Sequence, residues 1–213
     1  MRMHFHIITL FPEAFLSYFA ISILKRAVER GKIKINFYTP RDFTDDPHKR
    51  VDRRPYGGGP GMVLQAEPIL SAVKRAVGKK RGVKILILSP RGKPFDSVRA
   101  RTLARRCRHL VLIAGHYEGI DARVKKVLRA EEVSIGPYVL TGGELPAMVF
   151  IDAITRHIPG VLGNDESLEE ARIANGTVYT RPESLRFGKK TYRVPKILLS
   201  GDHKKIEAWK RAH

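Results

Sequence analysis

Short apolar runs alternate with helical patterns along most of the chain, and no other feature restricts the fold as strongly. The runs typical of buried strands occupy residues 3–10, 33–38, 84–88, 109–114 and 131–135. Helical patterns lie between or after them, at residues 12–30, 65–77, 97–107, 120–128 and 144–158. Because strands that alternate with helices are joined by crossovers, the sequence predicts an α/β fold with a mostly parallel sheet and helices on both faces.

Three loops that contain glycine follow predicted strands, at residues 89–93, 115–119 and 136–143. The carboxyl ends of parallel strands share one edge of a sheet, and open α/β sheets bind their ligands there. We therefore expect the three loops to lie together and to hold a polar ligand near the free N–H groups at the start of a helix. No GxGxxG motif stands at a strand–helix junction and no GxxxxGK[ST] motif occurs, so neither common nucleotide loop is indicated.

A fourth loop, residues 40–61, is polar, rich in glycine and long for a simple connection. Loops of this length inside a compact domain are usually functional. The weaker patterns after residue 163 predict a linker, then ordered structure only at residues 196–199 and in a helix over 202–212.

The charge of the chain points to a polyanionic partner. Lys and Arg number 40 against 21 Asp and Glu, which gives a formal net charge of +19. Nucleic acid is the commonest partner of such a surface, although a solvated basic surface or a membrane surface would also agree with the charge. Between Lys74 and Arg108 the only acidic residue is Asp96, and a second basic cluster covers residues 181–211.

Several classes of protein are disfavoured by the sequence. Cys107 is the only cysteine, so the chain forms no internal disulfide and no thiolate zinc site. No HExxH spacing occurs, and His4 and His6 alternate along a predicted strand, where we interpret them as structural. The N-terminus shows no signal-peptide pattern and no apolar run is long enough to span a membrane. We expect a cytoplasmic protein with no membrane contact and no resident metal.

The chain resembles the bacterial tRNA (guanine-37-N1)-methyltransferases of the SPOUT class. The segments that carry the resemblance occur in order and are ITLFPEAF, PRDFTDDPHKRVDRRPYGGGPGM, LSPRGKPF, GHYEGIDARV, SIGPYVLTGGELPAM and IPGVLG, then YTRPE and LLSGDHKKIEAW. The resemblance implies a SPOUT fold with a deep trefoil knot, an obligate homodimer, tRNA as partner and S-adenosyl-L-methionine as cofactor. Mg²⁺ is a further possible requirement.

The resemblance also implies roles for particular residues. The cofactor pocket is implied for Ser89, Pro90, Gly115, Tyr117, Gly119, Ser134, Ile135, Gly136, Tyr138, Val139, Leu140, Gly142, Gly143 and Pro146. The loop that helps to hold the target guanine is implied for Asp52, Tyr56, Gly57, Gly58 and Gly59. Arg156 is the implied group that stabilises charge developing on guanine O6, and Glu118 is implied to lie near the guanine. By position alone, Arg156 would instead offset the dipole at the end of its helix.

The chain departs from the family pattern after residue 163. The aspartate that serves as general base in the family falls on Ala171, so Glu169 or Glu170 is the candidate substitute, with a solvated linker as the alternative role of both. The predicted organisation is a knotted methyltransferase domain at residues 1–162, a flexible linker at 163–178 and a truncated helical segment at 179–213. His116 and Arg53 also differ from the residues usual in the family.

Two functions follow. The first is methyl transfer from S-adenosyl-L-methionine to N1 of guanine-37 in tRNA by a homodimer. The second is a related protein that binds cofactor and RNA with little or no methylation of guanine-37, because Ala171 and the short C-terminal segment remove parts that the family uses.

Overall fold

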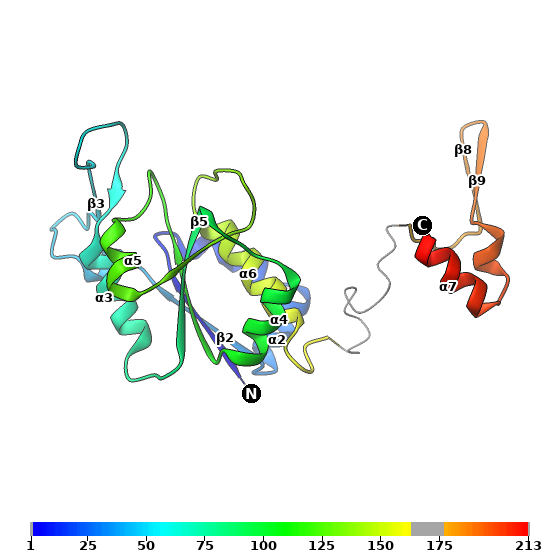
Figure 1. The fold of residues 1–213 in the computed structure, drawn as a ribbon, viewed down its shortest axis with the longest axis horizontal. Coiled ribbons are helices and arrows are strands. Elements are labelled where there is room, and N and C mark those ends of the chain that lie inside the picture. The colour runs from blue at the N-terminus through cyan, green and yellow to red at the C-terminus, as the bar shows by residue number, and fades with distance from the viewer. Residues whose placement is uncertain (1, 163–176, 213) are drawn as a thin grey trace. The chain divides into compact units, whose positions relative to one another are not determined.

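A computed structural model describes residues 2–162 and 177–212. The chain forms two compact units, Met1–Gly163 and Asn164–His213 (Figure 1). Most of the predicted linker, together with Glu169, Glu170 and Ala171, lies outside the described residues.

The first unit contains a five-stranded sheet whose neighbouring strands are all parallel, in the order β2-β1-β6-β5-β7. The strands are β1 (Met3–Ile8), β2 (Ile33–Tyr38), β5 (Val83–Pro94), β6 (His109–Ala114) and β7 (Glu131–Ser134). Helical segments connect successive strands of the sheet, so the predicted α/β fold with a mostly parallel sheet is confirmed.

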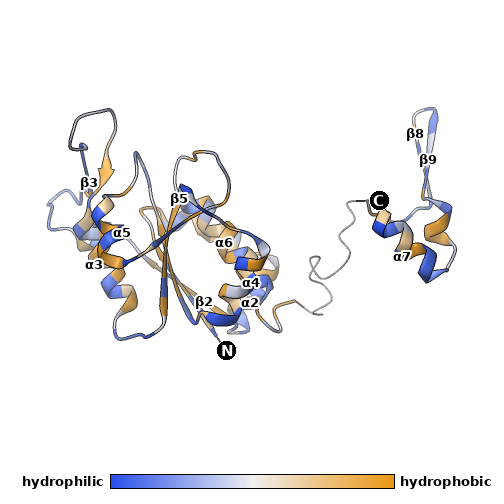
Figure 2. Cartoon of the chain, in the orientation of Figure 1, coloured by the Kyte–Doolittle hydropathy of each residue, from blue (hydrophilic) through white to orange (hydrophobic). Residues whose placement is uncertain are grey.

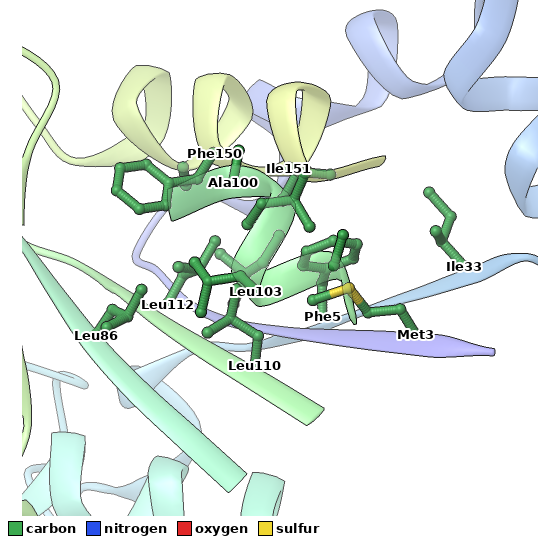
Figure 3. Close-up of a cluster of buried hydrophobic side chains, with 14 of the residues drawn as sticks. Met3, Phe5, Ile33, Leu86, Ala100, Leu103, Leu110, Leu112, Phe150 and Ile151 are labelled. Carbon is green, nitrogen blue, oxygen red and sulfur yellow. The ribbon is translucent and has the colours of Figure 1, made fainter. Parts of the chain in front are cut away.

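One face of the sheet is covered by α2 (Ser22–Glu29), α4 (Ser97–Arg106) and α6 (Glu144–Arg156). Side chains from four strands and two of these helices meet in the cluster drawn in Figure 3, where Phe5, Leu112 and Phe150 are fully buried. Figure 2 shows the same division, with apolar residues on the strands and on the helix sides that face them. Apolar burial of this kind is the main stabilising term of the unit.

The opposite face is covered by α3 (Ala66–Val77) and α5 (Ala122–Leu128). Their contacts form a second core cluster that includes Ile8, Ile69, Val111 and Val124, all at most 2% exposed. Helices on both faces were therefore predicted correctly. The strand order alone does not describe a threading of the chain, so the deep trefoil knot stays a prediction.

Two predicted elements differ from the structure. The single helix expected over residues 12–30 is instead a 3-10 turn η1 (Pro12–Phe15), a short α1 (Leu16–Phe19) and α2, because the chain turns at Ser22, whose φ is +52°. The strand expected over 84–88 continues to Pro94, with a register irregularity between Leu88 and Lys93. The predicted 89–93 loop is thus a distortion within β5 and not a separate connection.

A long loop joins β2 to α3. It holds a 3-10 turn η2 (Pro40–Phe43) and a small antiparallel pair of β3 (Asp52–Arg53) and β4 (Val63–Leu64). Asp46 binds Arg50 through both carboxylate oxygens, and this contact holds the pKa of Asp46 far below its usual range. The loop is therefore ordered by its own side chains.

The second unit contains an antiparallel hairpin of β8 (Ser184–Phe187) and β9 (Lys190–Arg193), a 3-10 turn η5 (Lys196–Leu199) and α7 (His203–Ala212). The sequence predicted the last two elements and missed the hairpin. Ser184–Phe187 does alternate polar and apolar residues and Gly188 follows it, but four residues are too few for a firm prediction from such a pattern. Trp209 of α7 packs near Tyr179, with ring centroids 6.2 Å apart.

Candidate functional site

A pocket of about 440 Å³ lies at the carboxyl ends of β5, β6 and β7. It lies at the ligand-binding edge that is usual for a parallel α/β sheet, and its volume is ordinary for a small-molecule site. The structure brings together here every residue that the sequence predicted to contact the cofactor: Ser89, Pro90, Gly115, Tyr117, Gly119, Ser134, Ile135, Gly136, Tyr138, Val139, Leu140, Gly142, Gly143 and Pro146. Glu118 lines the same pocket.

The second and third loops are joined through their backbones. The Gly143 N–H donates to the Gly115 carbonyl at 2.8 Å, and Gly142 forms an isolated bridge with His116. A Cβ on Gly143 would lie 2.6 Å from the Cα of Ala114, closer than any side chain tolerates. Glycine is therefore required here for the close approach of two backbones, and this part of the pocket wall is made of main chain.

The first and third loops are joined in a similar way. The Phe95 N–H donates to the Ser134 carbonyl at 2.8 Å, and the Gly136 N–H donates to the Ser134 hydroxyl at 3.1 Å. A Cβ on Gly136 would lie 2.2 Å from the ring of Tyr138, whose hydroxyl donates to the Ile135 carbonyl at 3.2 Å. The aromatic ring of Tyr138 is thus held over the loop at the rim of the pocket.

A buried contact fixes the start of α6 beside the pocket. The hydroxyl of Thr9, which follows β1, donates to Glu144 Oε1 at 2.7 Å. Both residues are buried, with Thr9 1% and Glu144 9% exposed. A carboxylate in the first turn of a helix is favourable because it offsets the helix dipole, and here it also ties α6 to the end of β1.

The candidate guanine loop lies against the same pocket. The Glu118 N–H donates to the Met62 carbonyl at 3.0 Å, and the Leu64 N–H donates to the Gly119 carbonyl at 2.9 Å. A Cβ on Gly61 would lie 2.5 Å from the Glu118 side chain. The end of the long loop thus packs directly on the second pocket loop.

The remaining residues predicted to hold the guanine occupy the earlier part of this loop. Asp52 begins β3 and pairs with Leu64, and Tyr56 is fully exposed. Gly57, Gly58 and Gly59 all have positive φ, between +82° and +112°. Such angles favour glycine, and a Cβ at any of the three would meet nothing within 4 Å, so this segment presents an open backbone without side chains.

Arg156 is the one described residue of the predicted catalytic set that does not lie at this pocket. It lines a second hollow of about 460 Å³ with Tyr18, Leu145, Val149 and other residues of α6. Twelve residues separate it from Glu144 at the other end of α6, which corresponds to about 18 Å along the helix axis. Within one chain, Arg156 and the pocket are therefore separate.

Sequence reasoning missed part of the pocket lining. The missed residues are Ile87, Leu88, Arg91, His116, Ile120, Asp121, Lys125, Glu132, Val133 and Thr141. Most of them stand next to predicted residues along the chain, so adjacency was the signal that could have found them. Lys125 and Glu132 form an ion pair of 2.6 Å, and a hydrogen bond from Arg123 lowers the pKa of Asp121.

Among residues 2–162 and 177–212, no group of three or more His, Cys, Asp or Glu side chains is arranged to hold a metal ion. No helix in the described parts of the chain has the length and apolar character needed to cross a membrane.

The fold and the pocket define an α/β protein with a pocket of small-molecule size between three backbone loops at the carboxyl edge of its sheet. A family model described as "tRNA (Guanine-1)-methyltransferase TrmD" matches residues 3–213. The chain belongs to this family.

Individual relatives agree with this assignment. A tRNA (guanine-N(1)-)-methyltransferase of Moorella thermoacetica is 46% identical over 215 residues, covering 98% of this chain and 84% of the relative. One of Clostridioides difficile is 45% identical and covers 98% of this chain and 91% of the relative. The crystal structure of tRNA (m1G37) methyltransferase from Aquifex aeolicus has a TM-score of 0.82 and 37% identity, covering all of this chain and 89% of that one.

Proposed function

We propose that this protein transfers a methyl group from S-adenosyl-L-methionine to N1 of guanine-37 in tRNA. Membership of the family and the names of the relatives favour this function over the alternative of a binding protein without methylation. The observation that carries the proposal is that the three pocket loops converge and that the end of the glycine-rich loop, at Gly61 and Met62, contacts Glu118 of the pocket, since a cofactor and a base must meet there. A tRNA substrate also agrees with the net charge of +19 and with a cytoplasmic location.

The described residues fit the proposed cofactor. Main-chain groups of Gly115, Gly136 and Gly142 line the pocket without intervening Cβ atoms, which suits a polar ligand that is held by backbone donors and acceptors. Tyr117 and Tyr138 are 47% and 52% exposed at the pocket, where their rings can stack on a purine. When bound, the cofactor supplies an electrophilic methyl group on its sulfonium.

The protein's own contribution is alignment and proton removal. The pocket and the glycine loop hold the guanine N1 in line with the methyl group. Binding therefore supplies the loss of translational and rotational entropy that the two reactants would otherwise undergo in the transfer step. We propose that Glu118 contacts the guanine, since it lies between the pocket and Gly61. Arg156 would stabilise negative charge on O6, and Glu169 or Glu170 would accept the N1 proton, as the sequence predicted.

We further propose that the active form is a homodimer. Arg156 is about 15 Å of helix away from Pro146, the residue of α6 that lines the pocket, so a site that contains both needs a second copy. The exposed side of α6 carries apolar residues, with Leu145 58% and Val149 44% exposed, and Tyr18, which lines the same hollow, is 38% exposed. A contiguous apolar surface of this kind typically marks a protein–protein interface.

Purified protein, labelled S-adenosyl-L-methionine and an unmodified tRNA bearing G36-G37 would test the proposal. We expect methyl incorporation at N1 of guanine-37 that is abolished in Arg156→Ala. Parallel reactions with Mg²⁺ and with EDTA would decide the predicted Mg²⁺ requirement. Cofactor binding without any methyl transfer by the wild type would instead favour the binding protein of the alternative hypothesis.

The base and the dimer need separate tests. We expect either Glu169→Gln or Glu170→Gln to slow the reaction and to raise the pH at which it reaches half its maximal rate. Full activity in both variants would exclude these two residues as the base. At a cofactor concentration too low to fill the pocket of Gly143→Ala, mixing this chain with the Arg156→Ala chain should restore part of the activity, because one of the two sites in the mixed dimer is then intact.

A further inference from the structure

Three histidines meet at the edge of the sheet opposite to the pocket. His4 and His6 lie on β1 and His109 begins β6, at the amino ends of these strands. His4 pairs in register with His109 of β6 on one side and with Lys34 of β2 on the other. The side chains of Lys34, His4 and His109 therefore form a row across one face of the sheet, and His6 lies on the same face two residues after His4. In Figure 1 the N label marks this edge. A strand of six residues such as β6 separates the row from the pocket by about 20 Å.

The imidazoles are packed against one another. His4 and His109 have ring centroids 4.8 Å apart, and His6 Nε2 lies 3.3 Å from His109 Nδ1. The other ring nitrogen of His6 lies 3.3 Å from the Tyr38 hydroxyl oxygen. His6 is only 2% exposed, whereas His4 and His109 are half-buried and reach the surface. The row is thus rigid and open to solvent on one side.

Exposed cations surround this row. Arg2, Lys34 and Arg108 act electrostatically on His4, and Lys80 acts on His6 and on His109. Together with burial, these positive charges lower the pKa of all three imidazoles. Like charges gathered in this way repel one another, so the cluster destabilises the folded protein unless an anion joins it.

No acidic side chain of the described residues forms an ion pair with Arg2, Lys34, Lys80 or Arg108. Elsewhere on the sheet, cationic side chains are neutralised by an acidic residue. The carboxylate of Glu131 in β7 lies within 4 Å of the cationic groups of Lys84, Lys93 and Arg99. Lys80 Nζ donates to the carbonyls of Ala76 and Val77 at the end of α3, at 3.0 and 3.3 Å, but no carboxylate neutralises its charge. The positive charge at the amino edge is therefore left available to a ligand.

We propose that this amino-edge patch, made of Arg2, Lys34, Lys80 and Arg108 around His4 and His109, binds the phosphate backbone of the substrate RNA. Lysine and arginine recognise phosphates as the sequence-independent part of nucleic-acid binding. A patch about 20 Å from the pocket would contact phosphates away from the target base, so it adds affinity without selecting the base. The proposal rests on the proposed function in one respect, that the RNA is a tRNA substrate.

RNA fits this patch better than a membrane surface does. Peripheral membrane binding combines basic residues with exposed apolar side chains that enter the lipid boundary. The large exposed hydrophobic side chains of the described residues include none from residues 31–34, 79–84 or 106–109, which form this edge. The patch offers charge alone, which is the chemistry of a phosphate backbone.

The test compares two double variants of equal charge. Lys34→Gln/Arg108→Gln removes two patch cations, and the control Arg26→Gln/Lys126→Gln removes two exposed cations from α2 and α5. Affinity for the tRNA and for a short RNA duplex is measured by fluorescence anisotropy over a range of salt concentrations. Equal cofactor affinity by calorimetry and equal thermal midpoints would show that both variants are folded.

The patch variant should bind RNA about tenfold more weakly near physiological salt, and its plot of log affinity against log salt should be shallower by about 0.7–0.9 per removed cation. The control should keep the wild-type slope. Equal slopes in the two variants would overturn the proposal while leaving methylation by the wild type, and hence the proposed function, intact. Patch-dependent binding to duplex RNA without methylation would instead support the patch and refute the proposed function. Patch-dependent binding to phosphatidylserine vesicles with unchanged RNA binding would overturn the proposal in favour of a membrane.

Discussion

Lowering the pH should destabilise the first unit through His6. Burial is the largest cause that lowers the pKa of His6, from 6.5 to about 4, followed by the positive charges of Lys80, His109, His4 and Lys34. The unfolded chain therefore binds a proton near pH 6.5 that the folded chain does not bind until the pH approaches 4. The stabilisation is complete above pH 6.5 and is lost as the pH falls towards 4.

The size of this effect follows from the two pKa values. Between pH 7.5 and pH 5 the free energy of unfolding should fall by about 2 kcal/mol because of His6 alone. His4 and His109 also have lowered pKa values, chiefly because of burial, and add to the loss in the same direction. In His6→Gln the His6 contribution disappears, so the variant should lose about 2 kcal/mol less than the wild type over this range.

Urea unfolding followed by circular dichroism at several pH values would measure the effect. His48 is an exposed histidine of the long loop, and His48→Gln is the matched control, which should retain the wild-type pH dependence. At pH 7.5 His6→Gln should itself be less stable by about 1 kcal/mol, because it loses contacts with Tyr38 and His109. The reasoning would be refuted by a His6→Gln variant that loses as much stability between pH 7.5 and 5 as the wild type.

Three further changes test the pocket, its anchor and the interface. Gly143→Ala should weaken S-adenosyl-L-methionine binding at least tenfold in calorimetry, because its Cβ would collide with backbone, whereas Gly115→Ala, with its nearest contact at 3.4 Å, should keep more affinity. Thr9→Val should lower the free energy of unfolding by about 1–3 kcal/mol in urea titrations, because it leaves the buried Glu144 carboxylate without its hydroxyl donor. Leu145→Lys should shift the mass measured by light scattering from dimer to monomer and abolish methylation, and an unchanged mass would argue against the α6 interface.

Much of the architecture could be predicted because it depends on local patterns. The strand over residues 109–114 is continuous and apolar, and it is bounded by turn residues, so its limits agree with β6 (His109–Ala114). The helix expected over 97–107 corresponds to α4, whose N-cap Asp96 accepts a hydrogen bond from the Arg99 N–H at 2.7 Å. Each of these signals lies within a few residues of the element that it specifies.

The errors lie where tertiary contacts override local preference. The pattern over residues 12–30 is helical throughout, yet the chain breaks near Ser22, and Phe15 of η1 and Ala27 of α2 enter the same core cluster from two separate helical segments. The extension of β5 to Pro94 depends on pairing with β7, which brings Gly92 against the backbone of Val133. A pairing partner distant in sequence cannot be deduced from the periodicity of one segment.

The sequence alone determined that this is an α/β protein with a basic surface and three glycine-containing loops after its strands. The resemblance to the methyltransferases added the residues of those loops, because motifs preserve local chemistry. Only the tertiary structure decided that these residues line one pocket, that Arg156 lies at the other end of α6, and that His4, His6 and His109 meet at the opposite edge. The positions of these residues depend on the order and register of the strands. Order and register are fixed by packing between segments more than 100 residues apart, such as β1 and β6, and not by any local pattern.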